Sequence, residues 1–300
     1  MGQSLLVTAE ETAVPPILIV DKEGSLGLGL CAKLQSQAQV VVVSRREPED
    51  KENTLSLPFS ESVPEIPEEQ YSHIFFVLDD EKKEAGIVTA CIKKAQRDGS
   101  YFCLIVDRRK LSRSPHAYLP QSLRNCAVVV VGDVFNIPVH KKHAFVIERL
   151  FKEAKISRAL ALPKMGLEKL YPVAYLDAVS AILQVAFSGK IKSTVSLVYP
   201  KFAVTELGIA RAMQKVNPSL KIDFSDSQSE KEEEVLQDEG EFVLPDEYPV
   251  FELLEKAYSA YSDEQGSNAQ PVREEAEVFT TPLVRQPTKK KKSLNHFFYI

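Results

Sequence analysis

The sequence contains no tryptophan, only four cysteines and three methionines among its 300 residues, and no long apolar run. No segment reaches the roughly twenty consecutive apolar residues that span a bilayer. The first residues show no basic region followed by an apolar core, which is the pattern of a secretory signal. The net charge of −5 gives no support for nucleic-acid binding through a generally basic surface. Hydrophobic residues (44%) and charged residues (26%) occur at the levels of an ordinary globular protein.

The cysteines are too scattered to form a metal site. Cys31, Cys91, Cys103 and Cys126 show no CxxC spacing, and three of them lie in or beside apolar runs. We expect buried free thiols, which suit a reducing compartment and therefore a cytoplasmic protein. The five histidines form no ligand cluster with them, so no metal site is predicted.

The stretch from residue 17 to residue 46 reads as strand, turn, helix and strand. Ile17–Val20 and Val40–Val43 are continuous apolar runs with the length of buried strands. Between them, a glycine-bearing turn leads into three leucines spaced four apart, which places them on one helical face. Such a unit of about thirty residues is typical of a parallel sheet. Its turn lies where dinucleotide-binding folds hold pyrophosphate at a helix N-terminus.

Strands and helices alternate along the chain. Further strands are expected at Ile74–Leu78, Tyr101–Val106, Ala127–Val131 and Val195–Val198. Leu55–Phe59, in the acidic connection after the first unit, is a candidate for a short strand contact. Amphipathic patterns predict helices over Glu81–Arg97 (with its lysines facing solvent), Phe145–Lys155, Asp177–Phe187 and Thr205–Val216. This alternation predicts an α/β fold, a doubly wound, mostly parallel Rossmann-type sheet over residues 17–222 with a small C-terminal α/β portion.

The flanking segments have a different composition. Residues 1–16 read as an irregular lead-in, and residues 223–262 combine an acidic insertion with a closing helix that packs back on the fold. Residues 263–300 read as a linker with a basic tail, in which Lys289–Lys292 precede aromatic residues. This tail resembles the cytoplasmic flank of a transmembrane helix. We therefore expect either membrane attachment after Ile300, on the cytoplasmic face, or a plain basic tail.

Four segments occur in an order that points to one family. They are VDKEGSLG (Val20–Gly27), VVGDVFNIP (Val130–Pro138), PVAYLDAVSAILQVA (Pro172–Ala186) and TELGIARAM (Thr205–Met213). They resemble, in turn, the TGGxGxxG, RPxNVYGP, YVDDVAxAI and TxxELAxAI segments of the extended short-chain dehydrogenase/reductase family, the NAD-dependent epimerases and dehydratases of nucleotide sugars. The resemblance implies NAD or NADP as cofactor and a nucleotide or nucleotide-sugar ligand.

The cofactor loop departs from the family pattern at its first position. Gly24 and Gly27 match the second and third glycines of the loop, but Asp21 replaces the first. A carboxylate 4 Å from a phosphate charge costs roughly 1 kcal/mol in water and about 4 kcal/mol at an effective dielectric constant of 20. Asp21 either weakens cofactor binding in this way or binds backbone amides in place of phosphate, and we favour the second interpretation. Both interpretations are compatible with a chain that binds no cofactor.

Two other cofactor positions also differ. The family's second strand normally ends in an acid that holds ribose hydroxyls, whereas here Ser44 is followed by Arg45. Arg45 either suits the 2′-phosphate of NADP or is simply solvated. Asp79 and Asp80 follow the strand at Ile74–Leu78, where ligands bind in such sheets. The two acids would do acid–base work, hold Mg²⁺, or lie in a solvated loop, which we favour.

The family's catalytic pair, the tyrosine and lysine of YxxxK, is not present. Tyr118 is the one tyrosine in the right interval, and Ser122 stands where the lysine belongs. Pro120 is incompatible with a helix interior. Too few residues separate Tyr118 from the strand near Val128 for the long helix that carries this motif. Tyr118 is therefore interpreted as a loop tyrosine, or as the proton donor if the protein is an active enzyme.

Three functions follow from these observations. The favoured one is an epimerase/dehydratase-like Rossmann protein without dehydrogenase chemistry that serves as a binding, regulatory or scaffolding domain. The alternative is an active NAD(P)-dependent nucleotide-sugar epimerase, dehydratase or reductase that binds cofactor through Gly24, Gly27 and Arg45 and uses Tyr118. The third is an interaction module that contacts a basic partner through the acidic stretch Ser225–Glu241.

Overall fold

The structure, a computed structural model, describes residues 14–48, 53–59, 66–136, 146–189, 193–225 and 240–263. Nearly all of the predicted lead-in, most of the acidic insertion, and the linker with its basic tail lie outside these residues. Within them, no helix is both long enough and apolar enough to cross a membrane.

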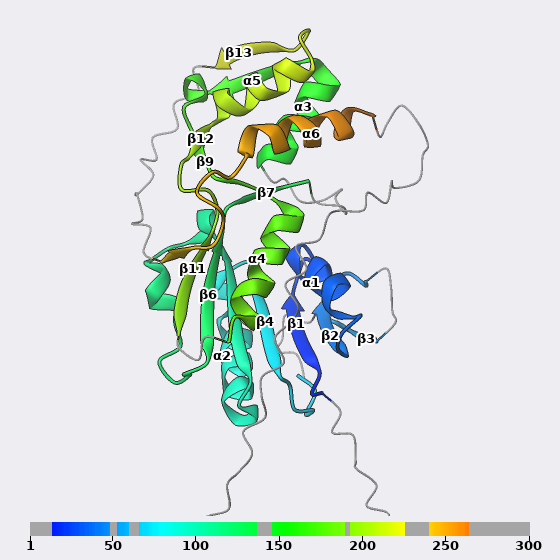
Figure 1. Ribbon diagram of the computed structural model, residues 1–300, viewed down its shortest axis with the longest axis vertical. Coiled ribbons are helices and arrows are strands. Elements are labelled where there is room, and N and C mark those ends of the chain that lie inside the picture. Colours follow the sequence, from blue (N-terminus) through cyan, green and yellow to red (C-terminus); the bar gives the residue numbers. More distant parts are fainter. Residues whose placement is uncertain are drawn as a thin grey trace, which may run out of the picture.

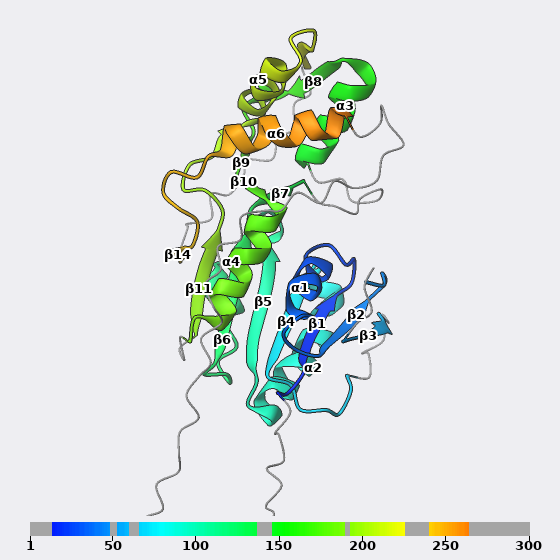
Figure 2. The ribbon, with the colours of Figure 1, turned by 45° about the vertical axis from the view of Figure 1, so that its right-hand side comes forward.

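Among the described residues, eight strands form one sheet in the order β3–β2–β1–β4–β5–β6–β11–β14, and all neighbouring strands are parallel (Figures 1 and 2). The strands are β1 (Ile17–Asp21), β2 (Val40–Ser44), β3 (Thr54–Pro58), β4 (His73–Leu78), β5 (Tyr101–Asp107), β6 (Cys126–Val131), β11 (Thr194–Val198) and β14 (Glu241–Phe242). The strand order reverses between β1 and β4, as in doubly wound dinucleotide-binding sheets. The predicted fold class is therefore confirmed.

The central strands are apolar throughout because the sheet is covered on both faces. Every residue of β1, β2 and β6 is buried. Strands buried on both faces lose the alternation of apolar and polar residues, which is why they read as continuous runs in the sequence. The four cysteines are buried and free, as predicted.

Helices cover the two faces unequally. They are α1 (Leu26–Leu34), α2 (Glu81–Asp98), α3 (Val146–Ser157), α4 (Tyr175–Phe187), α5 (Glu206–Val216) and α6 (Val250–Asp263). Helices α1 and α4 pack on one face of the sheet and α2 on the other (Figure 2). Between β5 and β6, residues 108–125 are all described and contain only the 3-10 turns η1 (Arg108–Lys110) and η2 (Pro115–Tyr118). The long helix that the family places there is absent from this connection, as the short spacing predicted.

A small lobe with its own core lies beyond the carboxyl end of the sheet (Figures 1 and 2). It packs α3, α5 and α6 against short strand pairs: β8 (Ala159–Pro163) with β13 (Lys221–Ser225), and β9 (Lys169–Leu170) with β12 (Val204–Thr205). The pair β7 (Asp133–Phe135) and β10 (Pro172–Ala174) lies between the lobe and the sheet, and η3 (Lys164–Gly166) follows β8. Thr205 caps α5 by accepting a hydrogen bond from the Gly208 amide at 3.1 Å, and α6 is the predicted closing helix.

Helices α1 and α4 touch through a glycine. A Cβ atom at Gly29 would overlap the hydroxyl of Tyr175 and lie 2.8 Å from Val179. The Tyr175 hydroxyl donates a hydrogen bond to the Ser25 carbonyl at 3.1 Å, across the start of α1. Burial, followed by the charge of Asp21, raises the pKa of Tyr175 to about 12. The hydroxyl therefore remains a proton donor at neutral pH, and it ties α4 to the turn after β1.

Two glycine-to-alanine changes in helices should have opposite effects. Gly29→Ala should destabilise the protein by about 1–3 kcal/mol, because the added methyl group has no space beside Tyr175. Gly86→Ala, at an exposed position of α2, should stabilise it by about 0.5–1 kcal/mol through helix propensity. Urea unfolding of the parent and the two variants measures both values. A stabilising Gly29→Ala would contradict the close contact between α1 and α4.

Candidate functional site

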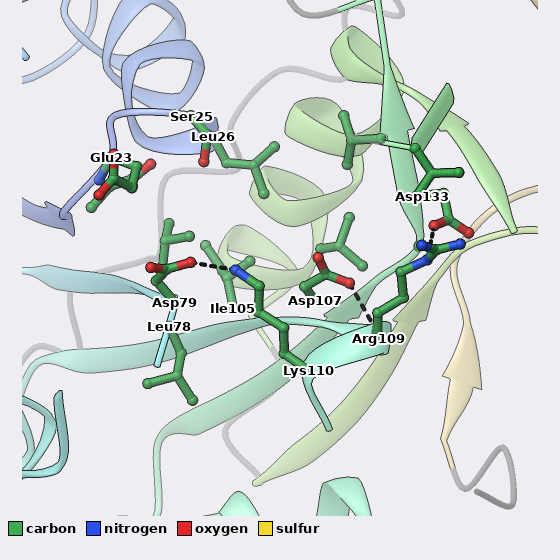
Figure 3. Close-up of a pocket in the computed structure, with 16 residues that line it drawn as sticks. Glu23, Ser25, Leu26, Leu78, Asp79, Ile105, Asp107, Arg109, Lys110 and Asp133 are labelled. Atoms are coloured by element: carbon green, nitrogen blue, oxygen red, sulfur yellow. Dashed lines mark hydrogen bonds and ion pairs between the residues drawn. The ribbon is translucent and has the colours of Figure 1, made fainter. Parts of the chain in front are cut away.

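The carboxyl ends of β1, β4 and β5 and the residues after β6 surround a cavity of about 220 Å³ (Figure 3). It lies where the strand order reverses, which is where doubly wound sheets bind ligands. The charged side chains that line it are Asp21, Glu23, Asp79, Asp107, Arg109, Lys110 and Asp133.

Asp21, at the end of β1, binds the backbone amides of the turn that follows it. One carboxylate oxygen accepts hydrogen bonds from the amides of Glu23 (3.2 Å) and Gly24 (2.9 Å), and the other accepts one from Gly27 (2.6 Å). The side chain is only 2% exposed. Amides at such a turn and helix N-terminus are the groups that hold phosphate in dinucleotide-binding folds. The carboxylate therefore binds the backbone amides of this turn; that it does so in place of a phosphate stays a prediction.

The two glycines of the turn accommodate this aspartate. Gly24 has a φ of +68°, and a Cβ atom there would lie 3.0 Å from the Ser44 hydroxyl. A Cβ atom at Gly27 would lie 2.6 Å from the Cβ atom of Asp21. Helix α1 has no acidic residue in its first turn and no side-chain cap from Ser25. Asp21 therefore supplies the negative charge that a helix N-terminus favours.

The predicted ribose-side residues do not reach the cavity. The Ser44 side chain is buried, and its hydroxyl accepts a hydrogen bond from the Arg46 amide at 3.2 Å. Arg45 is exposed and forms an ion pair with Glu23 at 3.4 Å. Neither Ser44 nor Arg45 is among the residues that line the cavity.

The adjacent acids after β4 have separate roles. Asp79 lines the cavity and forms an ion pair with Lys110 (Figure 3). Asp80 instead caps α2, where it accepts hydrogen bonds from the amides of Lys82 (3.1 Å) and Lys83 (3.2 Å). The two carboxylates therefore do not form a paired acid–base site. In the part of the chain that the structure describes, no group of three or more potential ligands could hold a metal ion.

A charge network that sequence reasoning did not find lies on the other side of the cavity (Figure 3). The Arg109 guanidinium forms ion pairs with Asp133, after β6, and with Glu168 of the small lobe at 3.1 Å. Asp107, at the end of β5, accepts a hydrogen bond from the Arg109 amide at 2.9 Å. Burial raises the pKa of both Asp107 and Asp133, and the nearby Arg109 opposes this rise. Arg109 thus joins the sheet to the lobe. The position of Asp107 at a strand end was the available sequence signal.

Tyr118 lies away from the cavity, in the core on the α2 face of the sheet. Its side chain is 7% exposed, and its hydroxyl donates a hydrogen bond to the Glu81 carboxylate at 2.8 Å. The Arg113 guanidinium lies 4.4 Å from the centre of its ring. These contacts attach η2 to the start of α2.

Sequence comparison gives no relatives, because no protein-family model and no curated protein matches the chain. Solved structures do resemble it. UDP-N-acetylglucosamine 4-epimerase from Methanobrevibacter ruminantium, solved with UDP-N-acetylmuramic acid, shares a TM-score of 0.61 at 10% identity over 84% of this chain and 99% of that one. The chain has the fold of the epimerases and dehydratases.

Two further structures support the same fold. The dTDP-glucose 4,6-dehydratase from Bacillus anthracis, solved with NAD, has a TM-score of 0.61 at 11% identity and covers 84% of this chain and 98% of its own. The ADP-L-glycero-D-manno-heptose-6-epimerase from Helicobacter pylori has a TM-score of 0.60 at 14% identity, over 85% and 97%. At these identities the similarity defines the fold. The chemistry of this chain must be argued from its own residues.

Asp107→Asn should change how the free energy of unfolding depends on pH. Because burial raises the pKa of Asp107 above its ordinary value of 3.8, its contribution to stability is full below that value and is lost as the pH rises through the folded-state pKa. The variant should match the parent near pH 4 and become progressively more stable than it towards pH 7. Urea unfolding at several pH values measures the difference. Asp223→Asn, at an exposed position, serves as the control substitution. A difference in unfolding free energy between Asp107→Asn and the parent that does not change with pH would contradict the raised pKa of Asp107.

Proposed function

We propose that this chain is a binding or regulatory protein of the epimerase/dehydratase fold that has lost dehydrogenase chemistry and does not hold a nicotinamide dinucleotide in the usual way. The observation that carries the proposal is that the Asp21 carboxylate accepts hydrogen bonds from the backbone amides at the start of α1. A dinucleotide needs those same amides for its pyrophosphate. The residues present therefore do not fit NAD or NADP.

The charge of the cavity supports the same conclusion. The described lining residues include five carboxylates but only two cations, Arg109 and Lys110. Both cations already form ion pairs, with Asp133 and Asp79 respectively. Bringing a pyrophosphate to this edge would place its negative charges near these carboxylates, at a cost of roughly 1–4 kcal/mol for each close pair.

The ligand class is proposed from the neighbours and from the position of the cavity. Similar structures contain UDP-sugars as well as NAD, so a nucleotide or nucleotide sugar is the first class to screen. A thermal-shift screen is sensitive enough, because a ligand at 100 times its Kd adds about 2.7 kcal/mol of stability. The buried free thiols support our inference of a reducing, cytoplasmic compartment.

Direct titration with NADH and NADPH tests the loss of cofactor binding. The parent protein should show no saturable binding below about 1 mM, because the Asp21 carboxylate is already hydrogen-bonded to the amides that a pyrophosphate needs. Isothermal titration calorimetry and cofactor fluorescence measure this. A Kd tighter than about 10 μM for either cofactor would overturn the proposal.

A matched pair of variants tests whether Asp21 is the cause. Asp21→Gly restores the family's first glycine and frees three amides, so it should bind NADH at least tenfold more tightly than the parent. Asp80→Gly removes a comparable helix cap at α2 and should leave NADH binding unchanged. Equal responses of the two variants would show that the Asp21 carboxylate does not block the site.

Tyr118→Phe distinguishes the proposed binding role from the alternative of an active enzyme, in which Tyr118 would be the proton donor. Because the Tyr118 hydroxyl is bonded to Glu81 outside the cavity, Tyr118→Phe should lower the free energy of unfolding by about 1–3 kcal/mol and leave ligand binding intact. Unfolding and ligand titration are measured on the same preparation. Turnover of a UDP-, GDP- or dTDP-sugar by the parent, abolished in Tyr118→Phe, would establish the enzyme instead.

A further inference from the structure

A second hollow, of about 530 Å³, lies in the small lobe between the segment after β11 and the start of α6. Its lining is mostly apolar and includes two aromatic side chains that solvent reaches: Phe202 is 77% exposed and Phe251 is 45% exposed. Gly208 of α5 forms part of the floor, and a Cβ atom there would lie 3.7 Å from the Phe251 ring. We call this hollow the α6 groove. It is separate from the cavity at the sheet edge.

The rim of the α6 groove is acidic. Asp246 and Glu252 line it, and Glu247 lies beside them on the exposed segment before α6. Lys201 is the one cation among the described lining residues, and it is paired with Asp246 at 2.6 Å. An apolar floor with exposed aromatics and an acidic rim suits an occupant that carries both aromatic rings and positive charge.

The chain itself contains a segment with this composition. Residues 289–300, outside the described part, read KKKKSLNHFFYI, in which Lys289–Lys292 precede Phe297, Phe298 and Tyr299. We propose that this basic aromatic segment binds in the α6 groove, with its aromatic residues against Phe202 and Phe251 and its lysines at the acidic rim.

The length of the intervening chain suits this contact. The groove lies at the first turn of α6, and the following chain starts at its last turn. Because a helix of 14 residues is about 21 Å long, the segment must reach back over about this distance to enter the groove. Residues 264–288 separate the end of α6 from the lysines, and a flexible linker of about 25 residues would have a root-mean-square span of roughly 25–30 Å. A connector that matches its span gives an effective concentration in the millimolar range. Even a contact with an intrinsic Kd of about 1 mM would then be substantially occupied.

Engagement in the α6 groove would sequester the lysines and aromatics that would otherwise bind an acidic lipid surface. The same segment therefore has two mutually exclusive uses, and we argue for the intramolecular one because both the charge and the apolar lining of the groove match it. Binding to membrane alone is the competing outcome of the test.

Cysteine cross-linking in the full chain tests the contact. The four native cysteines are buried, so introduced surface thiols react selectively. Ala203→Cys in the groove, combined with Asn295→Cys in the segment, should form an intramolecular disulfide at least tenfold faster than the control pair of Ile156→Cys with Asn295→Cys. Ile156 is 73% exposed on α3 of the same lobe but does not line the groove. Equal rates for the two pairs, or a product of dimer mass, would overturn the proposal.

A second measurement avoids changing the lobe. Phe297→Ser combined with Phe298→Ser should increase hydrogen exchange in residues 246–252 relative to the parent, since the groove would lose its occupant. Unchanged exchange would count against the contact. If the parent also sediments with phosphatidylserine vesicles, and Phe202→Ser leaves that affinity unchanged rather than raising it, the segment belongs to the membrane surface and the intramolecular contact is refuted.

Discussion

The carboxylate of Asp21 holds the turn on which the rest of the sheet depends. Its bonds to Glu23, Gly24 and Gly27 fix how the chain leaves β1 and enters α1. The direction of α1 in turn delivers β2 beside β1 and sets the face on which α4 packs. The carboxylate thus places a negative charge of the polypeptide at the amides where dinucleotide-binding folds hold phosphate.

The remaining changes at the sheet edge are consistent with that substitution. Where the fold would approach a cofactor, this chain places acids that are satisfied internally: Asp79 by Lys110, and Asp133 by Arg109. Arg109 also reaches Glu168, so the edge is joined to the small lobe by charge pairs. A partly buried guanidinium that serves two carboxylates orients both partners, because its donors form a rigid fork. These ion pairs therefore connect the walls of the crevice to one another and to the small lobe.

The fold was readable from the sequence because continuous apolar runs and helical periodicity are local signals. The site was only partly readable. Asp21 follows an apolar run directly, so its two possible roles could be named in advance, and the structure shows its carboxylate bonded to backbone amides. The pairing of Arg109 with Asp133 joins residues whose proximity depends on the order of β5 and β6, which no local pattern encodes. Lys94 of α2, expected to face solvent, is buried against Asp98 at 2.6 Å, because its ammonium also reaches backbone carbonyls before β4.

The hydrogen bond from Tyr175 to the Ser25 carbonyl has a consequence for the protein in the cell. Two side chains hold the turn after β1: Asp21 within the turn itself, and Tyr175 of α4, which packs beside α1 on the same face of the sheet. A protein that needs a bound dinucleotide to order this turn gains stability in proportion to the logarithm of the cofactor concentration. Here Asp21 and Tyr175 make contacts to this turn from within the chain, so under the proposed function the folded population would not follow the nucleotide supply. The domain would keep its shape through changes in metabolic state that alter cofactor levels.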